Sequence, residues 1–163
     1  MQTLPTPEDE YEEKAIADIK KHGVHVLNVF DPDGDDPSFN YSVGLWHSYE
    51  HPEILIYGLD ASVSTQLIND IANKCRAGDP APTHGLISSD YVMNFDVQFL
   101  HVPKSEYKEH FGWARWFYDG DDFPVLQMVF PDKHGNWPWS DDASEDFKWF
   151  QPVLGGVEGP QKH

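Results

Sequence analysis

The stretch 39–58, FNYSVGLWHSYEHPEILIYG, holds the densest group of side chains that could do chemistry. His47 and His51 are four residues apart in it, and Glu53 follows them. A zinc site needs at least three protein ligands with an ordered second shell, and the third would have to come from elsewhere in the chain. We therefore predict no metal, and we expect a hydrogen-bonding role for His51 at the tip of a hairpin. The candidate binding residues from this stretch are Trp46, His47, His51 and Glu53.

The sequence offers no recognisable set of catalytic groups. Acid–base catalysis needs two titratable groups with separated pKa values in one pocket. Glu50, Glu53, His51 and Asp132 qualify by type, but in a chain with 28 acidic residues some acids meet by chance. There is no GxSxG, no nucleophilic Cys–His arrangement, no GxGxxG and no phosphate-binding loop. We predict no catalytic residue and no cofactor.

The order of predicted elements over 39–77 leaves an alternative open. A strand, a turn, a strand and a helix in this order weakly resemble the split-barrel flavin proteins. Ser62, Ser64 and Thr65 at the start of the predicted helix would offer donors to a phosphate. Asp60 and the acidic charge of the chain oppose such a site. The alternative function is a ligand- or flavin-binding enzyme that uses the region 39–78.

Two aromatic segments are candidates for an interaction surface. The first runs over 111–118 and is followed by three aspartates. Rings that stay exposed beside acids would anchor a partner that the charge attracts, whereas core packing is the competing interpretation for most of them. The second segment is the PDKHGNWPW turn, whose tryptophans must cover something. The candidates from both segments are Trp113, Trp116, Asp119, Asp121, Asp122, Trp137 and Trp139.

The charge of the chain restricts its partners. The sequence has 28 acidic residues against 11 lysines and arginines, a formal net charge of −17. Binding to a phosphate backbone needs lysines and arginines that displace counterions, so we predict no nucleic-acid partner. The charge suits a basic protein partner, and an acidic, solvated surface without a partner is the competing interpretation. No apolar run reaches the roughly 20 residues of a membrane span, and the single cysteine excludes an intrachain disulfide, so we expect a cytoplasmic protein.

Local patterns predict an α+β fold in a single domain over 1–163, with flexible tails at 1–5 and 156–163. We expect a mainly antiparallel sheet of about five strands with two to four helices packed on it. Thr6 is the expected N-cap of the first helix, which ends at Gly23, and Asp60 is the expected cap of a helix over 61–77. The expected strands are 24–30, 39–46, 53–58, 95–102 and 123–130, with partial helices in 104–118 and 144–150. The aspartates of the turn 31–37 do not fit the EF-hand pattern.

Several motifs resemble those of the bacterial family known as domain of unknown function 4262. They are YSVGL at 41–45, HPEI at 51–54, LQMVFPDxxGxWPW at 126–139 and QPVLG at 151–155. The resemblance covers roughly 23–155. It implies a small bacterial cytosolic protein and supplies no activity, cofactor or catalytic residue. The acidic N-terminal helix and the aromatic segment 111–118 depart from the usual pattern of the family.

The sequence therefore predicts a small, acidic, protein-binding domain. Its most specific form would be an immunity-type inhibitor that neutralises a basic bacterial toxin. The sequence does not predict the oligomeric state.

Overall fold

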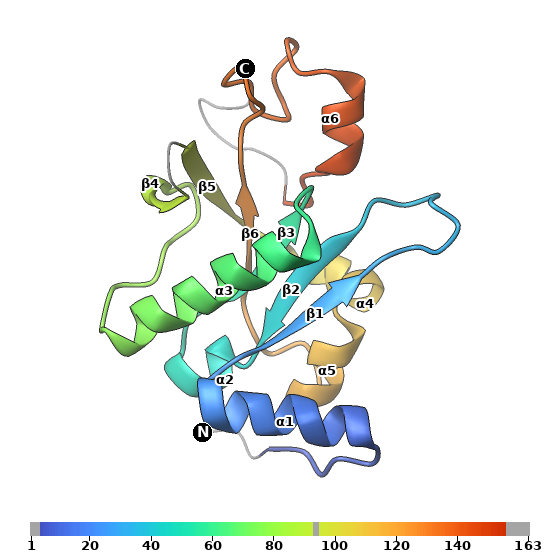
Figure 1. Cartoon of the computed structure of the whole chain (residues 1–163), viewed down its shortest axis with the longest axis vertical. Coiled ribbons are helices and arrows are strands. Elements are labelled where there is room, and N and C mark those ends of the chain that lie inside the picture. Colours follow the sequence, from blue (N-terminus) through green and yellow to red (C-terminus); the bar gives the residue numbers. More distant parts are fainter. Residues whose placement is uncertain (1–3, 93–94, 156–163) are drawn as a thin grey trace.

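A six-stranded sheet organises the protein (Figure 1). The computed structural model describes residues 4–92 and 95–155. The sheet has the order β1-β2-β3-β6-β5-β4. Neighbouring strands are antiparallel except β3 and β6, which are parallel. The strands are β1 (His25–Val29), β2 (Phe39–Val43), β3 (Glu53–Tyr57), β4 (Ile87–Val92), β5 (Phe95–His101) and β6 (Val125–Val129).

Six α-helices accompany this sheet in the described part of the chain, so the predicted α+β class is confirmed. The finer prediction was incomplete, because the sheet is mixed, has six strands instead of about five, and carries more than four helices. The additional helices are short and have too few residues for a visible period. The helices are α1 (Glu10–His22), α2 (Leu45–Tyr49), α3 (Ala61–Arg76), α4 (Tyr107–His110), α5 (Gly112–Tyr118) and α6 (Glu145–Phe150).

Both faces of the sheet are covered, which explains why the central strands are apolar on both sides. Side chains alternate along β3, so Ile54 and Ile56 face α3 while Leu55 and Tyr57 face the layer of α1, α4 and α5. In Figure 1, α3 crosses one face, and α4 and α5 lie behind the sheet. Leu100 of β5 and Val129 of β6 are covered by Trp137, Trp139 and Val153.

The ends of the long helices follow local rules with one correction. α1 ends at Gly23 in a left-handed conformation as predicted, and Asp60 caps α3 by accepting from the Val63 amide at 2.8 Å. The N-cap of α1 is Asp9, not Thr6, because the Asp9 carboxylate accepts from the Glu12 amide at 2.7 Å.

The predicted tails fall mostly outside the described residues, which exclude 1–3 and 156–163. Leu4, which was assigned to the first tail, packs against the core. Within the described residues no helix is long and apolar enough to cross a membrane.

The pair of strands in 39–58 is confirmed, but its connection differs from the prediction. β2 and β3 pair antiparallel with Phe39 opposite Tyr57. β2 ends at Val43, three residues earlier than expected, and the short helix α2 fills the connection. Gly44 is the N-cap of α2 at φ 117°. The helix forms here because a buried carboxylate holds its first amides.

Candidate functional site

The carboxylate that holds α2 belongs to Glu53, which is 1 % exposed at the start of β3. Its oxygens accept from the Ser42 hydroxyl at 2.7 Å and from the backbone amides of Gly44, Leu45 and Trp46 at 2.9, 3.2 and 3.2 Å. The Tyr118 hydroxyl at the end of α5 also donates to it. Glu53 thus ties β2, α2, β3 and α5 together.

The donors around Glu53 define its charge state. Burial raises the pKa of the Glu53 carboxyl above its ordinary value, while the hydrogen bonds from Tyr118, Ser42 and the amides oppose that rise. Three of these five donors are backbone amides, which cannot accept a hydrogen bond from a protonated acid. The geometry therefore favours the carboxylate. A carboxylate saturated with protein donors holds structure and has no lone pair directed at a substrate.

The two histidines of the 39–58 stretch have separate surroundings. The His47 amide donates to the Tyr118 hydroxyl at 3.1 Å, and its ring lies edge-on to Phe117. His51 is buried, and its Nδ1–H donates to the Pro52 carbonyl at 2.6 Å, so the expected hydrogen bond is present. His47 Nδ1 is buried without a hydrogen-bond partner among the described residues.

Acidification is expected to destabilise the protein through His51. Burial lowers the pKa of His51, although its hydrogen bond to the Pro52 carbonyl opposes the shift. Below about pH 6.5 the unfolded chain therefore binds a proton that the folded chain resists, and stability falls as the pH falls. Urea unfolding at about pH 7.5 and about pH 5.5 should show a larger loss for the wild type than for His51→Asn. Acidification also protonates other acids and reduces their mutual repulsion, but this effect is the same in both proteins. An equal loss of stability in both would therefore contradict the role of His51.

The aromatic segment of α5 is mainly core. Trp113 and Trp116 are partly buried against the layer of α1, α4 and α5, and Trp113 contacts the rings of Tyr11 and His25. The Asp121 carboxylate accepts from Arg115 Nε at 2.6 Å. Asp119 and Asp122 are exposed. The competing interpretation of core packing fits these tryptophans, so they do not form an exposed anchor.

The C-terminal tryptophans and glutamines also hold structure. Trp137 and Trp139 stack nearly parallel at 5.4 Å and cover Leu100 and Val129. The remaining connections are made by side-chain amides. Gln151 accepts from the Phe130 amide at 3.0 Å and donates to its carbonyl at 2.9 Å. Gln127 bonds the Pro152 carbonyl and the Leu154 amide, which fixes the segment after α6 on β6.

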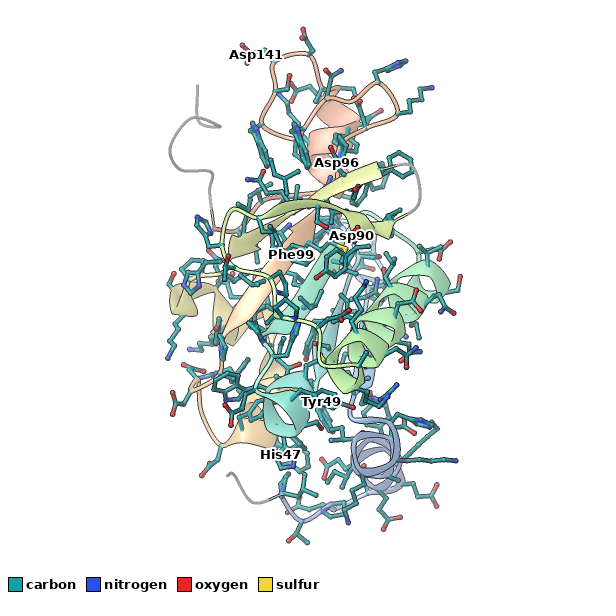
Figure 2. All side chains as sticks on the ribbon, turned by 90° about the vertical axis from the view of Figure 1, so that its left-hand side faces the viewer. His47, Tyr49, Asp90, Asp96, Phe99 and Asp141 are labelled. Atoms are coloured by element: carbon teal, nitrogen blue, oxygen red, sulfur yellow. The ribbon has the colours of Figure 1, made fainter. Side chains whose placement is uncertain are left out.

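The predicted site residues therefore do not form one site. Figure 2 shows His47 near one end of the molecule and Asp141, two residues after Trp139, at the other. Trp46, His47 and Glu53 lie together at the end of α5. The Tyr118 hydroxyl there contacts the His47 amide and the Glu53 carboxylate, which also accepts from the Trp46 amide. Trp137 and Trp139 lie on a separate cluster.

The phosphate cradle proposed for a flavin is already occupied. Asp60 caps α3 and accepts from the Ser62 hydroxyl at 2.9 Å. Ser64 is buried and bonds the Asn40 amide at 3.0 Å, so it points into the fold. The described strands form an open sheet with β1 and β4 at its edges. The flavin alternative stays a prediction without support from these groups.

One group of possible metal ligands occurs among the described residues, at Glu106, Glu109 and His110. The His110 ring already contacts the Glu106 carbonyl at 2.8 Å and the Tyr57 hydroxyl at 2.9 Å. Both ring nitrogens are engaged, so we assign no metal to it.

A groove lies where the turn after β1 faces α6. It has a volume of about 310 Å³ and combines carboxylates with exposed rings. Trp149 is 44 % and Phe150 54 % exposed. We call it the acidic–aromatic groove. Its lining is Asp31, Gly34, Asp36, Pro37, Ser38, Gly58, Leu59, Trp149 and Phe150.

The acidic side of this groove is organised by one aspartate. The Asp31 carboxylate accepts from the amides of Asp33, Asp35 and Asp36 at 3.0, 3.2 and 3.2 Å. The side chains of the three residues that donate these amides are exposed. No ion pair within 4–92 and 95–155 involves them. Their charge is therefore available to a partner.

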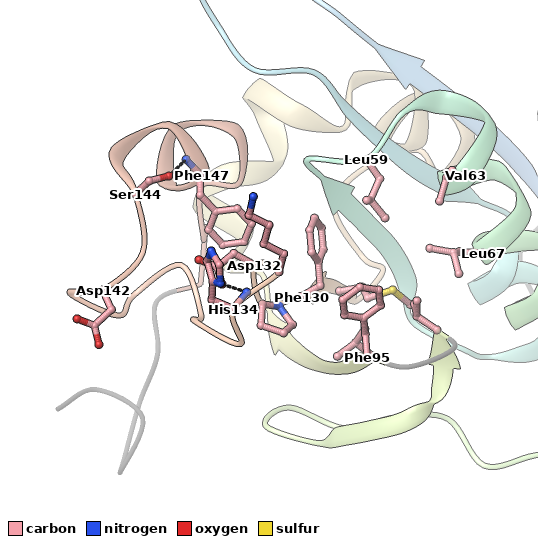
Figure 3. Close-up of a pocket in the computed structure, with 15 residues that line it drawn as sticks. Leu59, Val63, Leu67, Phe95, Phe130, Asp132, His134, Asp142, Ser144 and Phe147 are labelled. Carbon is pink, nitrogen blue, oxygen red and sulfur yellow. Dashed lines mark hydrogen bonds between the residues drawn. The ribbon is translucent and has the colours of Figure 1, made fainter.

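A larger, apolar cleft lies on the other side of Leu59 (Figure 3). Its volume is about 670 Å³. Figure 3 shows Val63 and Leu67 of α3 opposite Phe147 of α6, with Phe95 and Phe130 between them. Asp132, Lys133, His134, Asp142 and Ser144 complete its lining with Val92, Val97, Met128 and Pro131. We call it the apolar cleft.

The sequence did not predict the lining of the acidic–aromatic groove or of the apolar cleft. Trp149 and Phe150 are adjacent in a six-residue helix, so they cannot both point to the same side as Phe147. That was the available signal for exposed rings. The cleft gave no signal, because its walls come from four separate segments whose apolar residues are indistinguishable from core residues in the sequence.

The comparisons with known proteins give a family and no function. A family model described as "Domain of unknown function (DUF4262)" matches residues 18–144. No curated protein and no solved structure matches the chain.

Proposed function

Because the chain belongs to the family described as a domain of unknown function, DUF4262, we propose a function from the geometry alone. The protein is a binding domain whose acidic–aromatic groove engages a basic protein partner. The observation that carries this proposal is that exposed Trp149 and Phe150 line one groove with Asp31 and Asp36, which belong to a turn whose acids make no ion pair among the described residues. In the most specific form, the partner is a basic toxin and the protein is its cytoplasmic, immunity-type inhibitor.

The groove has the composition of a protein interface. Exposed aromatic rings supply apolar contact area at low entropic cost, and tryptophan is the residue most enriched among binding hot spots. Lysine and arginine side chains stack on ring faces and pair with carboxylates. Phe30, directly before the acidic turn, is 70 % exposed and extends the apolar part of this surface.

The charge of the whole chain supports the same partner. With a net charge of −17, the protein attracts basic proteins over a distance and raises their rate of association. Four ion pairs join the described side chains, and they involve Asp18, Glu106 and Asp121 as acids. Most of the acidic residues are therefore free to act on a partner.

Neutralising the acidic turn is expected to weaken partner capture by about tenfold or more. The variant is Asp33→Asn/Asp35→Asn/Asp36→Asn. The matched control, Glu8→Gln/Glu10→Gln/Glu13→Gln, removes the same charge from exposed positions at the start of α1. Tagged proteins would be used to capture partners from cells of the native host at about 50 mM and about 500 mM salt.

The expected result is a basic protein that the wild type and the control retain at low salt, that high salt releases, and that the turn variant fails to retain. If both triple variants lose it equally, the net charge acts without a defined groove. If no basic protein is retained in a salt-dependent way, the proposal fails.

A further inference from the structure

We propose that the apolar cleft is a binding site for an uncharged aromatic small molecule, a function separate from the partner surface. The cleft is concave and lies between α3, β5, β6 and the segment 131–147. Its volume of about 670 Å³ is within the range of small-molecule sites, about 300–1,000 Å³. Such a site takes a molecule of several fused rings.

The walls require a ligand with an apolar body. Val63, Leu67, Val97 and Met128 line the cleft together with three phenylalanines. Two polar groups of the lining are already used: Asp132 Oδ1 accepts from the amides of His134 and Asn136 at 2.9 Å each, and Ser144 Oγ accepts from the Phe147 amide at 3.1 Å. A polar group placed against the walls would lose its hydrogen bonds to water without replacement.

The charges at the cleft argue against a ligand with a net charge. Two carboxylates, Asp132 and Asp142, stand beside one ammonium, Lys133, and one imidazole, His134. Figure 3 shows the Asp142 carboxylate directed away from the cavity. An anion would be repelled by the net charge of −17, and an ammonium would have to leave water for walls that are mainly apolar.

The rings favour an aromatic ligand over an aliphatic one. Phe130 and Phe147 meet edge to face, with centroids 6.0 Å apart and an angle of 79°. Phe95 stands at the mouth and is 45 % exposed. A flat ring between these side chains would continue the edge-to-face and offset contacts that aromatic groups prefer.

The test uses three probes with one ring system and different charges: 1-pyrenemethanol, 1-pyrenemethylammonium and 1-pyreneacetate. Binding is followed by pyrene fluorescence, which reports the polarity around the ring, and by NMR shifts of the methyl groups of Val63, Leu67 and Met128. The neutral probe should shift these methyl groups and should bind at least as tightly as either charged probe.

Two matched tryptophan variants test whether the neutral probe binds in the apolar cleft. Val63→Trp places a large side chain in the cleft, whereas Val29→Trp adds the same side chain on β1, outside it; both valines are similarly exposed, at 43 % and 37 %. Val63→Trp should weaken the neutral probe by about tenfold or more, and Val29→Trp should leave it unchanged. Val63 does not line the acidic–aromatic groove, and the pyrene assay does not involve the protein partner, so failure here is distinct from failure of partner capture.

Three results would overturn the proposal. The first is the absence of methyl shifts in the wild type with the neutral probe. The second is a charged probe that binds about tenfold more tightly than the neutral one. The third is equal binding to the Val63→Trp and Val29→Trp variants, which would mean that the probe binds elsewhere.

Discussion

Glu53→Ala is expected to lower the free energy of unfolding by about 3–5 kcal/mol, because several buried donors lose their acceptor at once. The Ser42 hydroxyl and the amides of Gly44, Leu45 and Trp46 all point at this carboxylate. Each donor that stays buried and unpaired costs about 1–3 kcal/mol, and water entering the space left by the side chain would recover part of the sum. The N-cap residue of α2, Gly44, has no side chain to replace Glu53, so α2 should melt with the loss of the carboxylate.

Urea unfolding measures this effect, with Glu109→Ala as the control. Glu109 is an exposed glutamate in α4 and is not joined to the Glu53 group, so its removal should change stability by less than about 0.5 kcal/mol. The loss of unfolding free energy in Tyr118→Phe should lie between those of the Glu53 and Glu109 variants, because this change removes one donor and leaves the ring in place. Equal stabilities of the Glu53 and Glu109 variants would show that the carboxylate does not hold the fold.

Gly44→Ala is expected to cost on the order of 3 kcal/mol by a different mechanism, the combination of backbone strain and overpacking. Gly44 has φ 117°, which side-chain-bearing residues rarely adopt. A Cβ atom there would lie 2.8 Å from the Gly23 carbonyl oxygen and 3.1 Å from two carbons of Ile19. The backbone of the α1 end would have to move, and the Gly44 amide would leave Glu53.

Gly34→Ala is the matched control for this prediction. Gly34 also has a positive φ, 74°, but a Cβ atom there would meet nothing within 4 Å. The strain alone should cost about 1 kcal/mol. The difference between the unfolding free energies of the Gly44→Ala and Gly34→Ala variants measures the cost of the steric clash at Gly44. Similar values for both variants would contradict the close approach there.

Much of the fold follows from local patterns, since the long elements begin and end at strong signals. The end of α1 at Gly23 and the cap of α3 at Asp60 were both predicted, because each acts within one helical turn. α2 was not predicted, because the carboxylate that caps it lies on the next strand. The position of β6 between β3 and β5 also depends on contacts between distant segments, and no local pattern encodes them.

The site was harder to predict than the fold for a similar reason. Glu53 is predicted as a candidate binding residue, but its type alone does not distinguish a buried cap from a catalytic acid; the surrounding donors do. Trp113 is predicted as a binding residue from its type, and the structure adds that it is partly buried against the rings of Tyr11 and His25. Trp149 was not predicted, although its position next to Phe150 in a short helix was a signal that one of the two rings is exposed.

The most direct test of a partner surface is photo-crosslinking from the groove itself. A photoreactive phenylalanine analogue in place of Phe150 would be compared in native host cells with the same analogue in place of Tyr11, an exposed ring on α1, away from the groove. We predict a crosslink to one basic protein from position 150 and none from position 11. The absence of a crosslink from position 150, or the same products from both positions, would contradict the proposed partner surface.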